Sequence, residues 1–289
     1  AFLYVGGGLA LLRMLPGIGS VAEAFTTVTF IRAPFWVLLA ALAGGQLLFN
    51  RGLLAGVRLF LTGVLLASVY FAFFVFRESS STWVGVAAAL AVLTWLRWPR
   101  LRWLTVFIVT ALSIAGILFP SIYEFAGGDE AWVTTGGSRL ALIGRVVSVT
   151  MRNPITGLGP ASYRPYANAE PLGYRTALWI NPNVNSHNNY VDLFAHTGLL
   201  GLGLFLWFAV ELARLGWRLS KRHGRGFTGG YVSGMLAAWG ASLVLMMFAD
   251  WILPFVYNIG FRGFQASLLV WLFLGGLAAI DHIEDSPLD

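Results

Sequence analysis

The stretch from Asn181 to Phe205, NPNVNSHNNYVDLFAHTGLLGLGLF, sets a histidine between a run of asparagines and an apolar segment. Asn185 and Ser186 are residue types that commonly cap helices. We therefore expect His187 in the first turn of a helix that begins near Asn189, where the helix dipole disfavours an imidazolium cation. A neutral imidazole at that position can act as a general base. The alternative is a histidine that only satisfies hydrogen bonds at a helix start.

A second set of reactive candidates is arginine. Five arginines and no lysine occur between residues 139 and 175, namely Arg139, Arg145, Arg152, Arg164 and Arg175. The planar guanidinium binds phosphate or carboxylate in a bidentate manner and stays charged at any working pH. This pattern indicates an anion-binding segment. The alternative is that these arginines only contact lipid head groups, because long outer loops escape the charge bias of membrane proteins.

The segment GGSRLALIGRVVSVTMRNP predicts a helix that starts at Arg139, with Ser138 as its N-cap, and ends before Pro154. At 100° per residue, Arg145 and Arg152 share a polar face, as in a helix at the membrane interface. The opposite, apolar face consists of Leu140, Ile143, Val146, Val147 and Thr150. Arg139 projects into that apolar side.

Arg139 is unfavourable in its predicted place unless an anion binds there. A cation in the first turn opposes the helix dipole, whereas backbone N–H groups at a helix start attract phosphate. The Gly-Gly-Ser approach and the arginine converge on the same point. We therefore predict a phosphate site at Arg139.

The elements that must position these residues are membrane helices. The chain has 289 residues, of which 57% are hydrophobic and 11% charged, and no water-soluble domain of this length has such a composition. A span needs about 20 apolar residues to cross roughly 30 Å of hydrocarbon. The candidates are 34–49, 53–76, 82–96, 101–119, 189–210, 230–249 and 261–280. We predict an all-α polytopic bundle of about seven spans in a single transmembrane domain, 1–289, with AFLYVGGGLALL as the remnant of an earlier span.

Orientation follows from the basic segments. The stretch 211–230 and the turn RWPRLR are rich in arginine and lysine, so the positive-inside rule places both in the cytoplasm. The segment 120–188 then becomes a large, partly helical extracytoplasmic loop that carries the active site. The net charge of +6 is explained by the basic segments that orient the protein in the membrane, so we expect no nucleic-acid partner. The chain has no cysteine and, outside the membrane, no His, Asp or Glu grouping at metal spacing, so we expect neither a metal nor a cofactor.

Two motifs in this order resemble the O-antigen ligase and polymerase superfamily of bacterial membrane glycosyltransferases. They are P-x-x-G-x-G at Pro154, Gly157 and Gly159, and S-H-N at 186–188, which is followed by a glycine-punctuated span. The resemblance runs from about Val64 to Gly276. It includes the final stretch ADWILPFVYNIGFRGFQASLLVWLFLGGL, which is similar to the closing hairpin of that family.

The resemblance implies transfer of a glycan from an undecaprenyl-diphosphate carrier to an acceptor sugar hydroxyl at the outer face of the bacterial inner membrane, without a metal. Arg139 matches the arginine that holds the diphosphate, and His187 matches the histidine that activates the acceptor. The candidate substrate-binding residues are Arg77, Arg145, Ser186, Asn188 and Tyr190. The acceptor is a glycan or the lipid A core, and the surrounding membrane lipid is a further partner.

One position departs from the family pattern. The family has a Ser-Arg pair just before the span that here begins STWVGVAAAL, but this chain has Ser80 where the arginine is expected and Arg77 three residues earlier. One helical turn would bring Arg77 to the same place. The alternative is that Arg77 only anchors the end of a span at the interface.

Three other readings remain open at this point. A polysaccharide polymerase of the same superfamily shares these motifs. A lipid-linked glycan transporter or flippase also needs many spans, although its ionisable residues usually lie near the bilayer midplane, and the midspan stretches here lack charge. The third is an inactive scaffold that binds polysaccharide.

Overall fold

A computed structural model describes most of the chain. The described residues are 1–15, 17–18, 31–77, 79–126, 128, 137–160, 162–169, 172–174, 177–179, 186–253 and 256–285. They form helices, except for one antiparallel hairpin of β1 (Leu172–Tyr174) and β2 (Ala177–Trp179), in which Leu172 pairs with Trp179. The helical architecture agrees with the prediction, and the hairpin is an addition to it within the segment 120–188.

The core of the bundle is α3 (Ala33–Phe49), on which α5 (Ser80–Arg97) and α12 (Gly226–Leu245) pack. Residues 33 to 46 of α3 are all buried, because this helix is apolar on every side. Its contact with α12 is close: a Cβ on Gly45 would lie 2.8 Å from the backbone of Gly234. In a membrane the hydrophobic effect does not drive helices together, and small residues such as these glycines allow the close packing that holds them.

Among the described residues, three helices are long and apolar enough to cross a membrane. They are α4 (Ala55–Tyr70) continued by the π-helix η1 (Phe71–Val75), α11 (Asn189–Arg222), and residues 263–283 of α13 (Val256–Asp285). A fourth is possible if α6 (Leu101–Ile114) and α7 (Leu118–Phe125), which meet at 90°, form one bent span. The chain is therefore a multi-pass membrane protein. The count of about seven spans stays a prediction, since α1 (Phe2–Leu12) and α3 are shorter apolar helices.

The predicted continuous span 101–119 is wrong at its end. Gly116 has a φ of +69°, a conformation that glycine adopts without steric cost, and it stops α6. The N–H of Ile117 then donates to the carbonyl oxygen of Leu112 at 3.0 Å, as in a helix C-cap. The chain turns, so α7 lies across the direction of α6.

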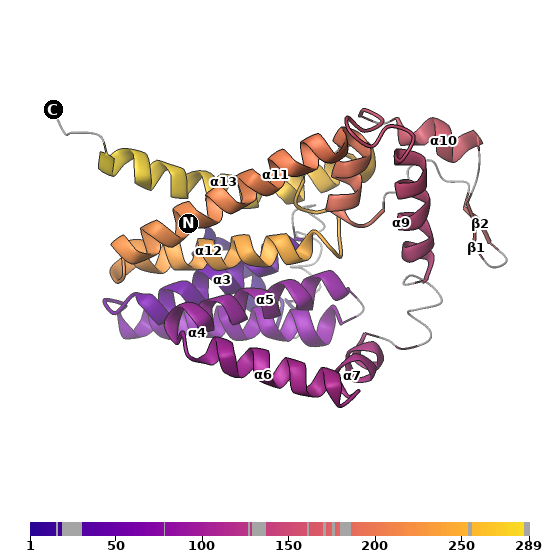
Figure 1. The fold of residues 1–289 in the computed structure, drawn as a ribbon. Helices are drawn as coiled ribbons and strands as arrows, with labels where there is room; N and C mark the ends of the chain where they lie inside the picture. Colours follow the sequence, from indigo (N-terminus) through magenta and orange to yellow (C-terminus); the bar gives the residue numbers. More distant parts are fainter. Residues whose placement is uncertain are drawn as a thin grey trace.

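The helices of the bundle run side by side, and the basic turns lie at one end (Figure 1). That end carries the α3–α4 turn, the α5–α6 turn and the α11–α12 turn. The opposite end carries α7, α9 (Gly137–Thr150), α10 (Tyr163–Ala169) and the hairpin, and α9 stands across the bundle axis. Helix α11 extends to Arg222, so many of the basic residues expected in a loop belong to a helix end.

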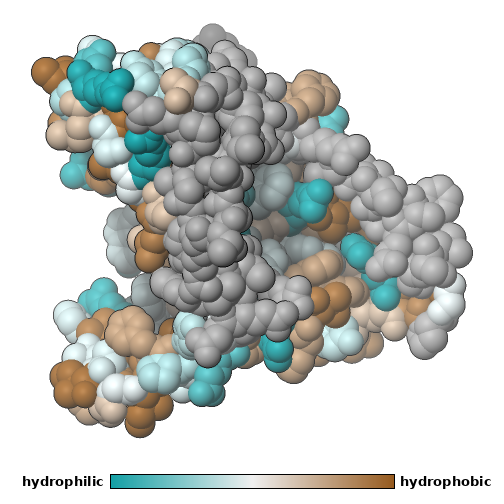
Figure 2. Space-filling view, turned by 90° about the vertical axis from the view of Figure 1, so that its right-hand side faces the viewer, coloured by the Kyte–Doolittle hydropathy of each residue, from teal (hydrophilic) through white to brown (hydrophobic). Residues whose placement is uncertain are grey.

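Seen from the end that carries α9, the molecule is hollowed on one side, between an upper and a lower lobe (Figure 2). Comparison with Figure 1 places α6 and α7 in the lower lobe. Helix α6 has no buried residue, so the lower lobe stands away from the core.

Candidate functional site

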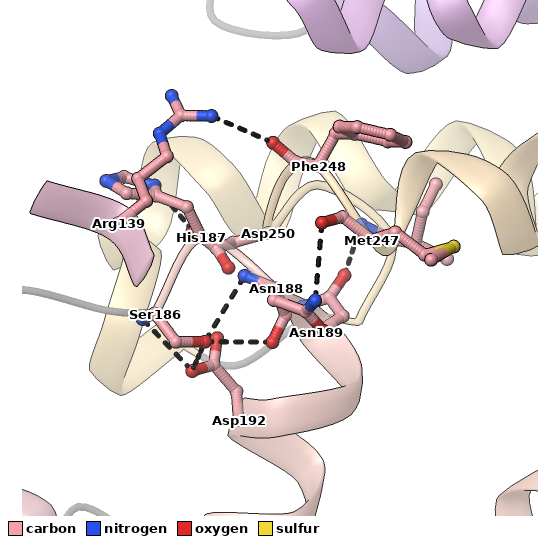
Figure 3. A network of polar contacts seen from close by, with 10 residues as sticks. Arg139, Ser186, His187, Asn188, Asn189, Asp192, Met247, Phe248 and Asp250 are labelled. Carbon is pink, nitrogen blue, oxygen red and sulfur yellow. Dashed lines mark hydrogen bonds and ion pairs between the residues drawn. The ribbon is translucent and has the colours of Figure 1, made fainter. Parts of the chain in front are cut away.

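Three segments that are distant in the sequence meet at the end of the bundle where α9 lies (Figure 3). They are the start of α9, the residues just before α11, and the connection 246–253 that follows α12. Arg139 comes from the first and His187 from the second, so the two residues predicted to be catalytic lie in one place.

The imidazole of His187 pairs with a buried carboxylate. Its Nδ1 lies 3.0 Å from Oδ2 of Asp250, whose side chain is 4% exposed, whereas that of His187 is 39% exposed. A carboxylate at Nδ1 fixes the orientation and tautomer of the ring, which leaves Nε2 to exchange a proton with a ligand. It also stabilises the imidazolium that forms when the ring accepts a proton.

His187 was expected in the first turn of the helix, but it precedes the helix. The N-cap of α11 is Asn188, whose Oδ1 accepts hydrogen bonds from the N–H groups of Tyr190 at 3.0 Å and Val191 at 3.2 Å. His187 itself has a φ of +54° and is the one non-glycine residue with a positive φ in the described ranges. Asn185, the other expected cap, lies outside the described residues.

Ser186 and Asp192 form a buried pair beneath the histidine. The Oγ of Ser186 donates to Oδ1 of Asp192 at 2.6 Å, and the Ser186 N–H donates to the same oxygen at 3.2 Å. The N–H of Asn188 in turn donates to the Ser186 Oγ at 3.2 Å. These bonds hold both neighbours of His187, so they fix the backbone that carries the ring.

Asn189 brings Asp250 to the histidine. It is fully buried, and its N–H donates to the Met246 carbonyl at 2.8 Å. Its Oδ1 accepts from the N–H groups of Ile252 and Leu253, both at 3.2 Å. The side chain of Asn188 adds a bond from Nδ2 to the Met247 carbonyl at 3.3 Å. The start of α11 and the connection 246–253 are thereby joined on both sides of Asp250.

Arg139 lies beside this pair. Its Nη1 donates to the carbonyl oxygen of Phe248 at 3.4 Å, in the same connection as Asp250. Burial lowers the pKa of Arg139, and the charge of Asp250 partly offsets that effect. Arginine nevertheless stays protonated in proteins, so the site holds a partly buried cation. Ser138 was predicted to cap this helix. The helix begins at Gly137, so Ser138 lies inside α9 instead.

The P-x-x-G-x-G motif anchors α9 to α11. At Gly198 the backbone of α11 leaves helical geometry, with φ 65° and ψ −164°. The loop that follows α9 packs into this kink: the N–H of Leu199 donates to the Pro154 carbonyl at 2.8 Å, and the N–H of Leu158 donates to the Ala195 carbonyl at 2.8 Å. A Cβ on Gly157 would collide with the backbone at Gly198. The two motifs therefore place the helix of Arg139 against the helix that follows His187.

The buried face of α9 differs from the predicted one. Leu142, Val146 and Val149 are buried, at a spacing of four and three residues, and Val146 packs with Ala195 of α11. Leu140, which was assigned to the apolar face, is 59% exposed. The predicted and observed faces share Val146 and Thr150, which are buried, but the prediction left out Leu142 and Val149.

Two other predicted substrate contacts lie away from His187. The guanidinium of Arg145 is near Tyr163 of α10, where its charge partly offsets a rise in the pKa of that tyrosine caused by burial. Tyr190 donates its hydroxyl to the Leu243 carbonyl at 2.8 Å, toward α12. Asn188 uses its side chain for capping, and Ser186 is buried, so their roles as ligands of a substrate stay predictions.

Arg77 reaches the correct end of the bundle, where η1 ends and α5 begins (Figure 1). Its side chain is exposed, and its carbonyl oxygen accepts a hydrogen bond from Nε1 of Trp83 at 3.1 Å. Within the described residues no hydrogen bond joins the Arg77 side chain to His187 or to the connection 246–253. Its service as the second family arginine stays a prediction.

Asp250 and Asp192 were not predicted from the sequence. Each is an isolated carboxylate in an apolar stretch of a chain with only 13 acidic residues, and that rarity was the available signal. Oδ2 of Asp192 and Oδ1 of Asp250 are buried without a hydrogen-bond partner among the described residues. Buried carboxylates are costly, and they are found at sites whose chemistry requires them. In the same part of the chain, no group of three or more His, Asp or Glu side chains could hold a metal ion.

Comparison with known proteins places these residues in a family. The model of a family described as O-antigen ligase matches residues 64–206. The match begins at Val64, where the resemblance was expected to begin, and includes Arg139, His187 and both motifs. Asp250 and the closing hairpin lie beyond its end. No curated protein matches the chain.

Proposed function

Because this chain belongs to the O-antigen ligase family, we propose that it transfers a glycan from undecaprenyl diphosphate to an acceptor sugar hydroxyl at the extracytoplasmic face of the bacterial inner membrane. The observation that carries the proposal is the meeting of a partly buried arginine and a carboxylate-paired histidine at the end of the bundle opposite the basic turns. Such an arrangement offers a cation for a leaving diphosphate and a base for a hydroxyl.

In the proposed reaction, the acceptor hydroxyl oxygen attacks C1 of the donor's first sugar. His187 takes the hydroxyl proton at Nε2 while Asp250 holds Nδ1 and stabilises the resulting imidazolium. The bond between C1 and the diphosphate oxygen breaks, and the diphosphate leaves with the electron pair. Arg139 stabilises the charge that develops on that oxygen. The proton then passes from His187 to the diphosphate or to water.

The shape of the molecule supports a lipid-linked donor. The hollow opens on one side of the molecule, at the end that carries α9 (Figure 2), which is also the end where the site lies. Helix α6, which borders it, exposes large apolar side chains such as Phe107 and Ile114. A donor embedded in the bilayer could approach the arginine through this opening without leaving the lipid.

The test is glycan transfer by the purified protein in liposomes that contain undecaprenyl-diphosphate-linked oligosaccharide and candidate acceptors, with EDTA present. We expect His187→Ala and Arg139→Ala to lose product. Two matched controls should retain it: His223→Ala, at the basic end, and Arg152→Ala, which follows the end of α9 and stacks over Tyr166. Equal loss in the controls, or full activity of both site variants, would contradict the assignment.

Product length separates the two activities of the superfamily. A single transfer indicates a ligase, whereas a ladder of products indicates a polymerase. If the wild-type protein moves the lipid across the bilayer but never cleaves the diphosphate bond, whichever acceptor is offered, the protein is a transporter.

A further inference from the structure

A second concave surface lies on the other half of the molecule, away from His187. It is a groove of about 910 Å³ between α5 on one side and α11 on the other, with α12 as its floor. The floor residues run from Ser233 to Leu243. At 1.5 Å per residue this floor is about 15 Å long, which accommodates a large part of an extended acyl chain.

The walls of the groove are apolar. Trp95 of α5, Trp217 of α11 and Trp239 of α12 all line it. Trp239 is 1% exposed, and its Nε1 donates to the carbonyl oxygen of Ala209 at 3.1 Å, so it closes the base of the groove without offering a polar atom. Such walls suit hydrocarbon and would leave no good partners for a polar solute.

The end of the groove at the basic turns is positively charged. Its lining includes four basic residues, Arg102, Arg214, Arg218 and Lys221, and one acidic residue, Glu211. Glu211 pairs with Arg214, and Lys221 lies over the ring of Trp217 at 4.6 Å. Arg218 is exposed and forms no ion pair within the described residues. Three positive charges remain in excess beside an apolar trough.

We propose that this groove binds an anionic phospholipid, with its phosphate among Arg102, Arg218 and Lys221 and an acyl chain along α12. Guanidinium groups bind phosphate oxygens in pairs, and basic pockets between membrane helices attract anionic head groups. A zwitterionic lipid carries a compensating ammonium group and gains less from the excess charge. The site is separate from the proposed glycan transfer and does not depend on it.

The experiment measures lipid binding to the delipidated full chain by native mass spectrometry. Phosphatidylglycerol and phosphatidylcholine with identical acyl chains are titrated separately. We expect the anionic lipid to bind more tightly, and the triple variant R102Q/R218Q/K221Q to weaken its binding on the order of 100-fold while leaving that of phosphatidylcholine unchanged. The matched control, R51Q/R100Q/R225Q, removes the same charge from the same end outside the groove and should bind like the wild type.

A second variant tests the trough itself. Ala213 lines the groove and is half-buried, so Ala213→Trp fills it without a change of charge and should abolish binding of phosphatidylglycerol. Equal affinity for both lipids, or equal loss in both triple variants, would overturn the proposal in favour of general attraction to a basic surface. Displacement of the phospholipid by undecaprenyl diphosphate, with no effect of the groove charges, would assign the groove to the donor instead and also overturn it.

Discussion

Oδ2 of Asp250 lies 3.0 Å from Nδ1 of His187, although 63 residues and a full pass through α11 and α12 separate them in the chain. The contact joins the part of the protein that matches the family model to a part beyond the end of that match. A site built in this way needs both parts to fold together.

Asp250→Asn should keep the fold and lose most of the activity. The amide has the same shape as the carboxyl group but cannot stabilise an imidazolium, so we expect kcat to fall about 100-fold or more. The measurement is glycan transfer at saturating donor, together with the melting temperature. Wild-type kcat in a folded Asp250→Asn protein would remove Asp250 from the mechanism.

The pH dependence of the rate should follow His187. A protonated imidazole cannot accept the hydroxyl proton, so kcat/KM should fall in acidic solution. Burial lowers the pKa of Arg139, but arginine stays charged near neutrality and should add no second limb. The check is a profile from about pH 5 to pH 8, and a rate that does not change across this range would count against a histidine base.

Arg139→Lys should fail almost as badly as Arg139→Ala. Lysine keeps the positive charge but lacks the planar fork that binds two diphosphate oxygens, so we expect kcat/KM for the donor to fall roughly 100-fold. The matched control is Arg152→Lys, just beyond the end of the same helix. A fully active Arg139→Lys protein would show that charge alone, without bidentate geometry, is sufficient.

Gly198→Ala should separate α9 from α11. The backbone conformation at Gly198 is one that only glycine adopts readily, and a Cβ there would collide with the Ile155 carbonyl. We expect a loss of about 2 kcal/mol or more in stability and a matching fall in the melting temperature. Gly203→Ala, where a Cβ meets open space, should be neutral or stabilising by about 0.5–1 kcal/mol. Similar melting temperatures for the two variants would show that the kink does not hold α9.

The sequence was sufficient to select Arg139 and His187 as candidates, because each is conspicuous in its local context: a cation at a helix start, and an imidazole beside an apolar helix. It could not find Asp250, since nothing in the stretch MMFADWILP indicates a partner 63 residues away. The glycines of both motifs were visible as a pattern, yet their purpose depends on two backbones in contact. Gly116, which ends α6, is a residue type that stops helices, but the apolar run continues beyond it and so favoured a longer span.

The positive φ of His187 opposes the proposed catalytic role of this residue to the stability of the fold. A left-handed backbone costs a residue with a side chain roughly 1–2 kcal/mol, and glycine would remove that cost along with the imidazole. The protein therefore retains a locally unfavourable residue whose backbone is fixed by the buried Ser186 and Asn189 on either side. The ring is aimed before any substrate arrives, so little conformational freedom is lost when the acceptor binds. Selection for heat resistance alone should therefore favour glycine at position 187, at the expense of turnover.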